Sequence, residues 1–304
     1  MHSDRTPQIP VNGDRHPGPS TPVLEEAYRL CRTLATTHYE NFPVGSHLAP
    51  RRLRKYIHAI YAFARVADDL ADEGNIPPDD RIRSLDQWRE QLNLCFAGTP
   101  RDPLFVALSD AIQNCSLPKQ LFEDLLDAFR MDVTTSGFER YDDVLLYCSK
   151  SANPIGRLLL AVFGCSTQET VILSDHLCTG LQLANFWQDL SVDIRKGRMY
   201  LPLEDVERFG YTRSNLRHGV VNDEFRGLME FQVQRTRGLF AASSSLPGMV
   251  GARLGLELRL TWNGGMTILQ KIERSGYSVL GGRPVITTTD KLRILAASLL
   301  RNLK

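Results

Sequence analysis

A chain of 304 residues with 36 basic and 35 acidic side chains carries a formal net charge of +1, which argues against nucleic-acid binding through general basicity. The composition, 42% hydrophobic and 23% charged, is that of a globular protein able to bury a substantial core. No apolar run reaches the roughly 20 residues that span a bilayer, and the first residues lack the apolar segment of a secretory signal.

The N-terminal residues 1–22 are rich in Pro, Gly, Asp and Ser, a composition that predicts a disordered lead-in. The remainder, 23–304, shows no linker and no internal repeat, and is predicted to be a single all-α domain. Six cysteines fall in apolar contexts without a CxxC spacing. This usage indicates reduced core residues, and hence a cytoplasmic protein.

Apolar residues recur at spacings of three and four along successive segments, and strand-like alternation is nearly absent. Turns containing Gly or Pro separate these segments. We therefore expect helices at 23–41, 51–73, 79–97, 102–115, 118–134, 141–163, 167–193, 222–245, 249–275 and 288–303. Residues 195–221 resist a helical period and are expected to form an excursion between two helices. Long helices with short connections favour an all-α bundle.

An acidic cluster ends the second predicted helix, in the stretch YAFARVADDLADE at residues 61–73. Asp68 and Asp72 lie four positions apart and so share one helix face, as do Asp69 and Glu73. Like charges at this spacing are destabilising unless something offsets them. Taken alone, the cluster is explained about equally well by a solvated polar face near a helix end.

A second polar stripe changes that balance. In QLANFWQDLSVD, residues 182–193, Asn185, Asp189 and Asp193 recur every four residues on an otherwise apolar helix. Two packed helices with such stripes suggest facing walls that share divalent cations. Oxygen ligands without nearby Cys or His favour Mg²⁺, which prefers substrate phosphates to complete its shell. The implied ligand is therefore a diphosphate, for which nearby basic residues supply complementary charge: Arg65, Arg195, Lys196 and Arg198.

Three motifs, in combination and in order, resemble the squalene and phytoene synthase family, the head-to-head prenyl synthases. They are YAFAR-x2-DDLAD at 61–72, YC-x3-A at 147–152, and LQLAN-x3-D-x3-D followed by RKGRMYLP at 181–202. The resemblance covers roughly residues 35–283. It implies an isoprenoid-synthase helical bundle around a deep apolar cavity, with a prenyl diphosphate held at the mouth through Mg²⁺.

The resemblance also implies roles for individual residues. The implied metal ligands are Asp68, Asp72, Asn185, Asp189 and Asp193. The residues it implies to contact the diphosphate or line its site are Arg65 and Tyr277, which join Lys196 and Arg198, the diphosphate-binding candidates chosen for their charge. The catalytic candidates it implies are Tyr61, one turn before Arg65, Tyr147, which resembles the family tyrosine near the reacting carbons, and the amide Gln182. Asn153 is a further catalytic candidate, which departs from the family pattern and adds an amide near the cavity wall.

Two departures from the family pattern narrow the expectation. Gln188 stands where many relatives have Arg, and Asn153-Pro154 interrupts a segment that is usually small and Gly-rich. With the block at 46–73, these departures most resemble the hydroxysqualene synthases of bacterial hopanoid pathways, which ionise presqualene diphosphate and let water capture the cation. The alternatives are squalene, dehydrosqualene, phytoene or presqualene diphosphate synthases acting on prenyl diphosphates such as farnesyl diphosphate.

A non-catalytic helical scaffold derived from the same fold is a further alternative. Loss of the aspartates would mark such a scaffold, and both stripes are intact here. The sequence leaves open the oligomeric state and a peripheral contact with membranes, and it gives no reason to expect a nucleic-acid partner.

Overall fold

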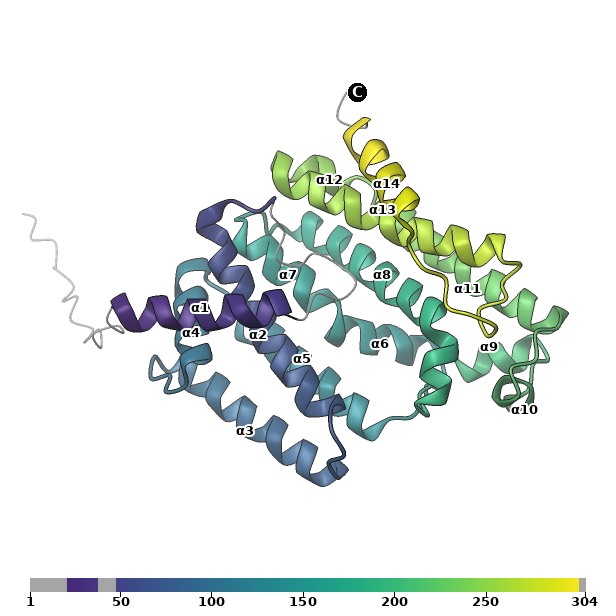
Figure 1. The fold of residues 1–304 in the computed structure, drawn as a ribbon, viewed down its shortest axis with the longest axis horizontal. Coiled ribbons are helices and arrows are strands. Elements are labelled where there is room, and N and C mark those ends of the chain that lie inside the picture. Colours follow the sequence, from purple (N-terminus) through teal and green to yellow (C-terminus); the bar gives the residue numbers. More distant parts are fainter. Residues whose placement is uncertain (1–20, 38–47, 301–304) are drawn as a thin grey trace, which may run out of the picture.

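The structure is a computed structural model that describes residues 21–37 and 48–300. Within these ranges the regular structure is helical and no strand occurs, which confirms the predicted all-α fold (Figure 1). The helices are α1 (Thr21–Thr37), α2 (Arg51–Asp72), α3 (Pro78–Phe96), α4 (Pro103–Cys115), α5 (Lys119–Thr134), α6 (Tyr141–Ser151), α7 (Asn153–Val162), α8 (Gln168–Arg195), α9 (Leu203–Arg208), α10 (Arg213–Arg217), α11 (Asp223–Ala242), α12 (Leu246–Met249), α13 (Ala252–Arg274) and α14 (Thr288–Leu300).

The helix boundaries differ from the sequence prediction in a few places. α1 begins at Thr21, inside the expected disordered lead-in, whose residues 1–20 lie outside the described residues. The expected excursion at 195–221 contains the short helices α9 and α10. The predicted helix 141–163 is two helices, since Pro154 near the start of α7 has no amide hydrogen for the carbonyl of Lys150 and its ring crowds that turn.

Two hydrophobic cores fill the molecule. The first lies among α1–α5 and α7, where Phe63 of α2 contacts the rings of Phe105 and Phe122 edge to face, at centroid distances of 6.1 and 5.3 Å. The second lies among α6, α8 and the C-terminal helices, around the buried Trp187 and Phe240. The two helices that carry the acidic stripes, α2 and α8, therefore belong to different cores.

α7 lies between these two helices and packs against both. α7 approaches α8 closely at Gly156, where an added Cβ atom would lie 2.3 Å from Ser174 Oγ and 2.5 Å from Cys178 Sγ. Only glycine fits there. α7 thus holds α2 and α8 apart along their length, and their C-terminal ends remain free to flank a polar site.

Within residues 21–37 and 48–300, no helix is both long and apolar enough to cross a membrane.

Candidate active site

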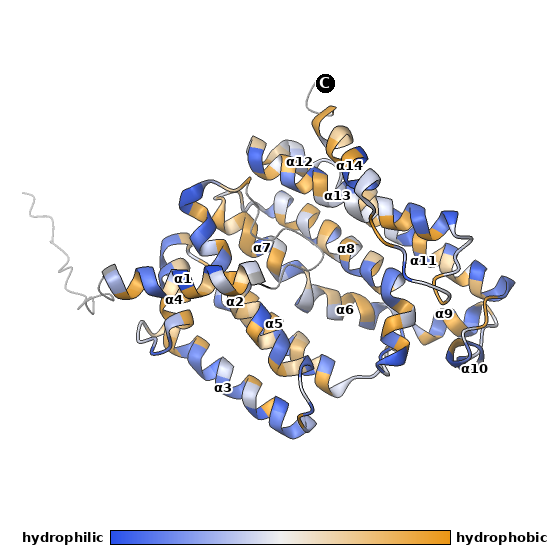
Figure 2. Cartoon of the chain, in the orientation of Figure 1, coloured by the Kyte–Doolittle hydropathy of each residue, from blue (hydrophilic) through white to orange (hydrophobic). Residues whose placement is uncertain are grey.

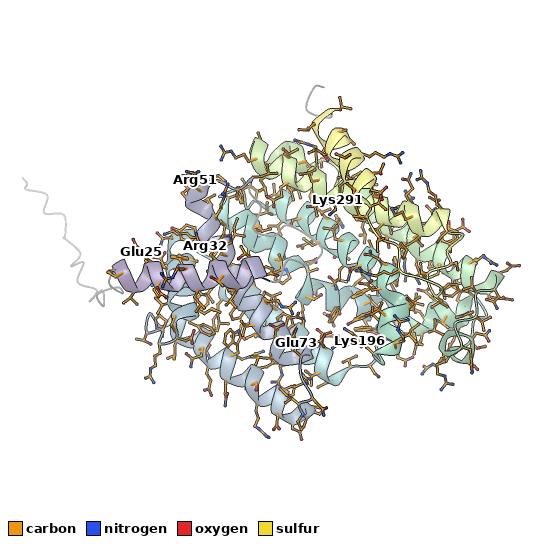
Figure 3. The ribbon with its side chains drawn as sticks, in the orientation of Figure 1. Glu25, Arg32, Arg51, Glu73, Lys196 and Lys291 are labelled. Atoms are coloured by element: carbon orange, nitrogen blue, oxygen red, sulfur yellow. The ribbon has the colours of Figure 1, made fainter. Side chains whose placement is uncertain are left out.

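The structure brings the C-terminal end of α2 next to the end of α8. Arg198, in the turn that follows α8, forms a bidentate ion pair with Asp72, the last residue of α2. Figure 3 shows the labelled Glu73 and Lys196 side by side at these two helix ends. The two acidic stripes, more than a hundred residues apart in the chain, therefore border one site.

The acidic side chains of the α2 end are neutralised in part by Arg65, one turn earlier on the same helix. Its guanidinium lies 2.5 Å from Asp69, 3.0 Å from Glu73 and 3.6 Å from Asp68. Burial raises the pKa of Asp68 to about 6; Arg65 opposes this rise, and the charges of Asp72 and Asp69 add to it. The C-terminal end of α2, one wall of the site, thus carries more negative charge than Arg65 offsets.

The α8 wall shows the same excess of negative charge. Burial, together with the charges of Asp189 and Asp72, raises the pKa of Asp193 to about 6. The contribution of Asp72 means that carboxylates of the two helices act on one another across the site. Such repulsion is relieved by a cation placed between the walls.

Asp132 near the end of α5 is a site residue that the motifs missed. Tyr147 donates a hydrogen bond to its two carboxylate oxygens at 2.8 and 3.0 Å, and Tyr200 donates a longer one at 3.4 Å. Burial raises the pKa of Asp132 to about 7, partly opposed by the Tyr147 hydrogen bond, with Asp68 and Asp72 raising it further.

A sequence signal for Asp132 existed. Leu121, Leu125 and Ala128 form the buried stripe of α5, and Asp132 continues it at the next helical position. An acid on a core-facing position is a candidate for function. The aromatic rings around it are closely packed, because Tyr200 stacks on Phe186 with a centroid distance of 3.8 Å and an interplanar angle of 5°.

Arg283, in the segment between α13 and α14, is the second site residue that the motifs missed. It forms a bidentate ion pair with Asp189 on α8. The neighbouring Gln188 donates a hydrogen bond to the carbonyl of Pro284 at 2.6 Å. The positive charge beside Asp189 thus comes from Arg283, 94 residues away, and not from the neighbouring position 188.

A polar pocket of about 540 Å³ opens between the ends of α2 and α5 and the turn after α8. Its lining includes the predicted diphosphate ligands Lys196 and Arg198, together with Asp72, Asp132 and Arg81. Arg81 donates to the backbone carbonyls of Leu70, Glu73 and Gly74 and so fixes the turn that ends α2. The pocket has the charge pattern expected for a site that binds an anion together with cations.

An apolar pocket, also of about 540 Å³, lies between α8, α13 and α14. Asn185 of the predicted metal set lines it, and so do the apolar residues Leu181, Ala184 and Ile268. One face of α8 therefore passes from the polar site into an apolar enclosure.

The remaining predicted residues are placed as follows. Tyr61 and Gln182 are half-buried on α2 and α8. Asn153 is buried, and its amide oxygen accepts a hydrogen bond from Thr179 at 3.0 Å, so it ties α7 to α8. Tyr277, with a φ of 60°, lies in the turn that follows α13, and its charged neighbours are Glu230, Glu273 and Arg237. These interactions of Asn153 and Tyr277 do not involve the aspartates of the two stripes.

The donor atoms of the two stripes are of the kind that binds a hard cation. They are carboxylate and amide oxygens, with the two walls' carboxylates in mutual repulsion. In the described part of the chain, no group of three His, Cys, Asp or Glu side chains is arranged to hold one ion. Asp72 and Asp189 are instead paired with Arg198 and Arg283. The residues present fit Mg²⁺, provided that these arginines give way.

An all-α bundle with two acidic helix ends, flanking arginines and an adjoining apolar pocket defines the class of isoprenoid synthases that act on diphosphates. The chain belongs to the squalene/phytoene synthase family, whose family model matches residues 35–290. This membership confirms the resemblance drawn from the motifs. The enzymes of the family act on prenyl diphosphates, and the chain is accordingly a prenyl-diphosphate-using synthase.

Similar proteins include both squalene-type and phytoene-type enzymes. The chain is 33% identical to a phytoene synthase of Arthrospira platensis, over 91% of this chain and 93% of that protein. It is 34% identical to a 15-cis-phytoene synthase of a Synechocystis species, over 91% and 86% of the two chains.

Solved structures extend the comparison. The squalene synthase HpnC of Alicyclobacillus acidocaldarius superposes with a TM-score of 0.80 and 40% identity, over 84% of this chain and 95% of that one. A ligand-bound dehydrosqualene synthase has the same TM-score at 24% identity, over 92% and 98%, and shares the fold.

Proposed function

We propose that the protein is a hydroxysqualene synthase of hopanoid biosynthesis, which converts presqualene diphosphate and water into hydroxysqualene and diphosphate. The proposal rests on one observation: three features lie next to one another. The ends of α2 and α8 are acidic, their arginines lie at the mouth, and a buried acid–tyrosine pair lies beside them. The 40% identity to HpnC supports the choice of squalene-type chemistry.

Diphosphate binding is assigned to the basic residues of the polar pocket. Arg198 and Lys196 line that pocket, and Arg65 lies 3.6 Å from Asp68 on α2. Their donors complement phosphate oxygens. The residues that would hold Mg²⁺ are Asp68, Asp72, Asn185, Asp189 and Asp193. Bound Mg²⁺ would supply positive charge that stabilises the departing diphosphate.

Ionisation breaks the bond between the carbon and the ester oxygen, and both electrons leave with the diphosphate. Arg65 and Arg198 stabilise the charge that develops on the leaving group. The carbocation left behind needs an enclosure without stray nucleophiles. The apolar residues Leu181, Ala184 and Ile268 offer such a surface on α8 and α13.

Capture requires one water molecule whose oxygen forms the new carbon–oxygen bond and whose proton is removed. Tyr147 and Asp132 are assigned this proton: the phenolic oxygen accepts it as the phenol's own proton passes to Asp132 along their 2.8 Å hydrogen bond. Gln182 and Tyr61 are proposed to orient the water and the substrate. Asn153, which bonds to Thr179, is proposed to hold the α7–α8 wall in place.

The decisive experiment uses the purified protein with Mg²⁺ and presqualene diphosphate, in the absence of NADPH and in isotopically labelled water. The expected product is hydroxysqualene with the label in its hydroxyl group, with diphosphate released. Farnesyl diphosphate alone should be a poor substrate. Efficient formation of squalene or dehydrosqualene from farnesyl diphosphate, or the absence of label from the alcohol, would overturn the proposal.

A head-to-head condensation of the phytoene type is the second candidate, because the relatives at 33 and 34% identity are phytoene synthases. The same assay with a longer prenyl diphosphate tests it. A cytoplasmic enzyme with a peripheral membrane contact is proposed for either candidate, since both act on molecules with long apolar chains.

A further inference from the structure

The last helix, α14, rests on α13 along one narrow stripe. Asp290 pairs with Lys271 at 2.7 Å. Ile294, four residues later, is half-buried, and Ser298, four residues further, is buried. The carbonyl of Ser298 accepts a hydrogen bond from Arg259 Nε at 3.0 Å. These largely polar contacts determine which side of α14 faces the bundle.

The opposite side of α14 is a row of exposed leucines. Leu292 is 65% exposed, Leu295 44% and Leu299 47%. At about 100° per residue, these three share one face, turned away from the stripe of Asp290, Ile294 and Ser298. Figure 2 shows hydrophobic residues along α14, at the margin of the bundle. Scattered surface leucines need no explanation, but a contiguous apolar face indicates a binding surface.

Cations flank this leucine face. Lys291 and Arg293 are exposed and lie on its two sides. The single acid of α14, Asp290, is already paired with Lys271. A leucine face with basic flanks matches a helix that lies in the surface of an anionic bilayer. A second copy of the chain fits less well, because it would bring these cations together without acids to offset them.

The apolar pocket adjoins the base of α14. Lys291 and Ile294 of α14 line it on one side, and Asn185 of α8 lines it on another; Figure 3 labels Lys291 at this end of α14. Val285, which also lines the pocket, is 52% exposed. An apolar chain that leaves a bilayer at α14 would therefore enter a pocket that also borders the second acidic stripe at Asn185.

We propose that α14 docks the enzyme on anionic membranes, with the face of Leu292, Leu295 and Leu299 inserted among the lipid chains and with Lys291 and Arg293 on the headgroups. The helix lies in the membrane surface and does not cross it. This inference deepens the peripheral contact of the proposed function and rests on it only for the apolar nature of the substrate. It holds for either candidate product.

The test is flotation of the full chain with phosphatidylglycerol-containing vesicles and with phosphatidylcholine vesicles. The parent is expected to float with the anionic vesicles and much less with the neutral ones. The variant Leu292→Gln, Leu295→Gln, Leu299→Gln should lose at least about tenfold in vesicle affinity. The matched control is Leu146→Gln, Ile172→Gln, on α6 and α8, whose side chains are 54% and 50% exposed; it should float like the parent.

Two further measurements separate membrane docking from catalysis and test the role of the cations. Turnover of detergent-solubilised substrate should be equal in the parent and the α14 variant, which separates docking from chemistry. Lys291→Glu, Arg293→Glu should abolish the preference for anionic vesicles. Equal flotation of the parent and the leucine variant would overturn the inference. So would sedimentation showing a dimer of the parent that the leucine variant dissociates, because the face would then bind a second copy.

Discussion

Tyr147 of α6 donates its phenolic hydrogen bond to Asp132 of α5, with its oxygen 2.8 and 3.0 Å from the two carboxylate oxygens. The pair is enclosed by Phe138, Phe186 and Tyr200. In so apolar a setting, a hydrogen-bonded acid holds its partner in one orientation. Tyr147 is thus positioned by an acid from a different helix.

The pair leads to a prediction for Asp132→Asn. The amide still accepts a hydrogen bond from Tyr147 but cannot take up its proton, so kcat should fall about 10²–10⁴-fold with little change in KM. Steady-state kinetics would measure this. Tyr200→Phe, which removes only the longer hydrogen bond, is the control and should change kcat much less. Equal effects of the two substitutions would contradict a proton-accepting role.

The acidic walls are tested by Asp68→Ala and Asp189→Ala. Each should abolish turnover with Mg²⁺ while the helical circular dichroism is unchanged, since each removes an oxygen ligand from a site with few others. Asp223→Ala, at a side chain that is 99% exposed on α11, should retain activity. Near-normal turnover in both wall variants would contradict the metal site.

The proposed diphosphate-binding role of Arg65 is tested by comparing Arg65→Gln with Arg52→Gln on the same helix. Arg65 contacts three acids of the site, whereas Arg52 is exposed in the first turn of α2. Inorganic diphosphate with Mg²⁺ should raise the melting temperature of the parent and of Arg52→Gln. It should raise that of Arg65→Gln much less, because one phosphate donor is gone. Equal protection of all three proteins would exclude a special role for Arg65.

The raised pKa values predict the direction in which the stability of the fold changes with pH in the absence of Mg²⁺. A carboxyl whose pKa is higher in the folded state than in the unfolded chain stabilises the fold at low pH, and this stability is lost as pH rises through the folded pKa. The pKa values are about 6 for Asp68 and Asp193 and about 7 for Asp132. Stability should therefore fall between about pH 4 and pH 7, and Mg²⁺ with diphosphate should restore it.

Two substitutions on α5 test the same pKa effects on stability. At pH 8 without Mg²⁺, Asp132→Asn should raise the melting temperature by at least about 2 °C. Asp127→Asn, on the same helix, should lower it. Burial alone would raise the pKa of Asp127, but hydrogen bonds from Arg89 and Lys150 outweigh burial and lower it. Thermal melts followed by circular dichroism would check both signs.

The sequence predicted the helices and the two acidic stripes because both depend on local spacing. The stripes at 68–72 and 185–193 recur at helical intervals, and the helices that carry them follow from the same period. The break between α6 and α7 depends on Pro154 acting inside an otherwise continuous pattern, where a helix can also bend without ending. Periodicity alone does not distinguish the two outcomes.

Asp132 and Arg283 were missed for a different reason. Each acts through a partner far along the chain, Tyr147 from another helix for Asp132 and Asp189, 94 residues away, for Arg283. No spacing rule connects such pairs, because tertiary packing alone brings them together. Gln188 shows the same limit: its amide holds the backbone of Pro284, 96 residues away.

Arg198 and Arg283 act as built-in counter-ions for Asp72 and Asp189. A divalent cation that binds these carboxylates must exchange with a guanidinium group, which weakens its binding when it arrives alone. A diphosphate offers the displaced guanidinium groups a new anion at the same moment. Cation and diphosphate should therefore bind with positive cooperativity, each raising the affinity for the other by the same factor, and the two walls would remain closed by their own arginines until both have arrived.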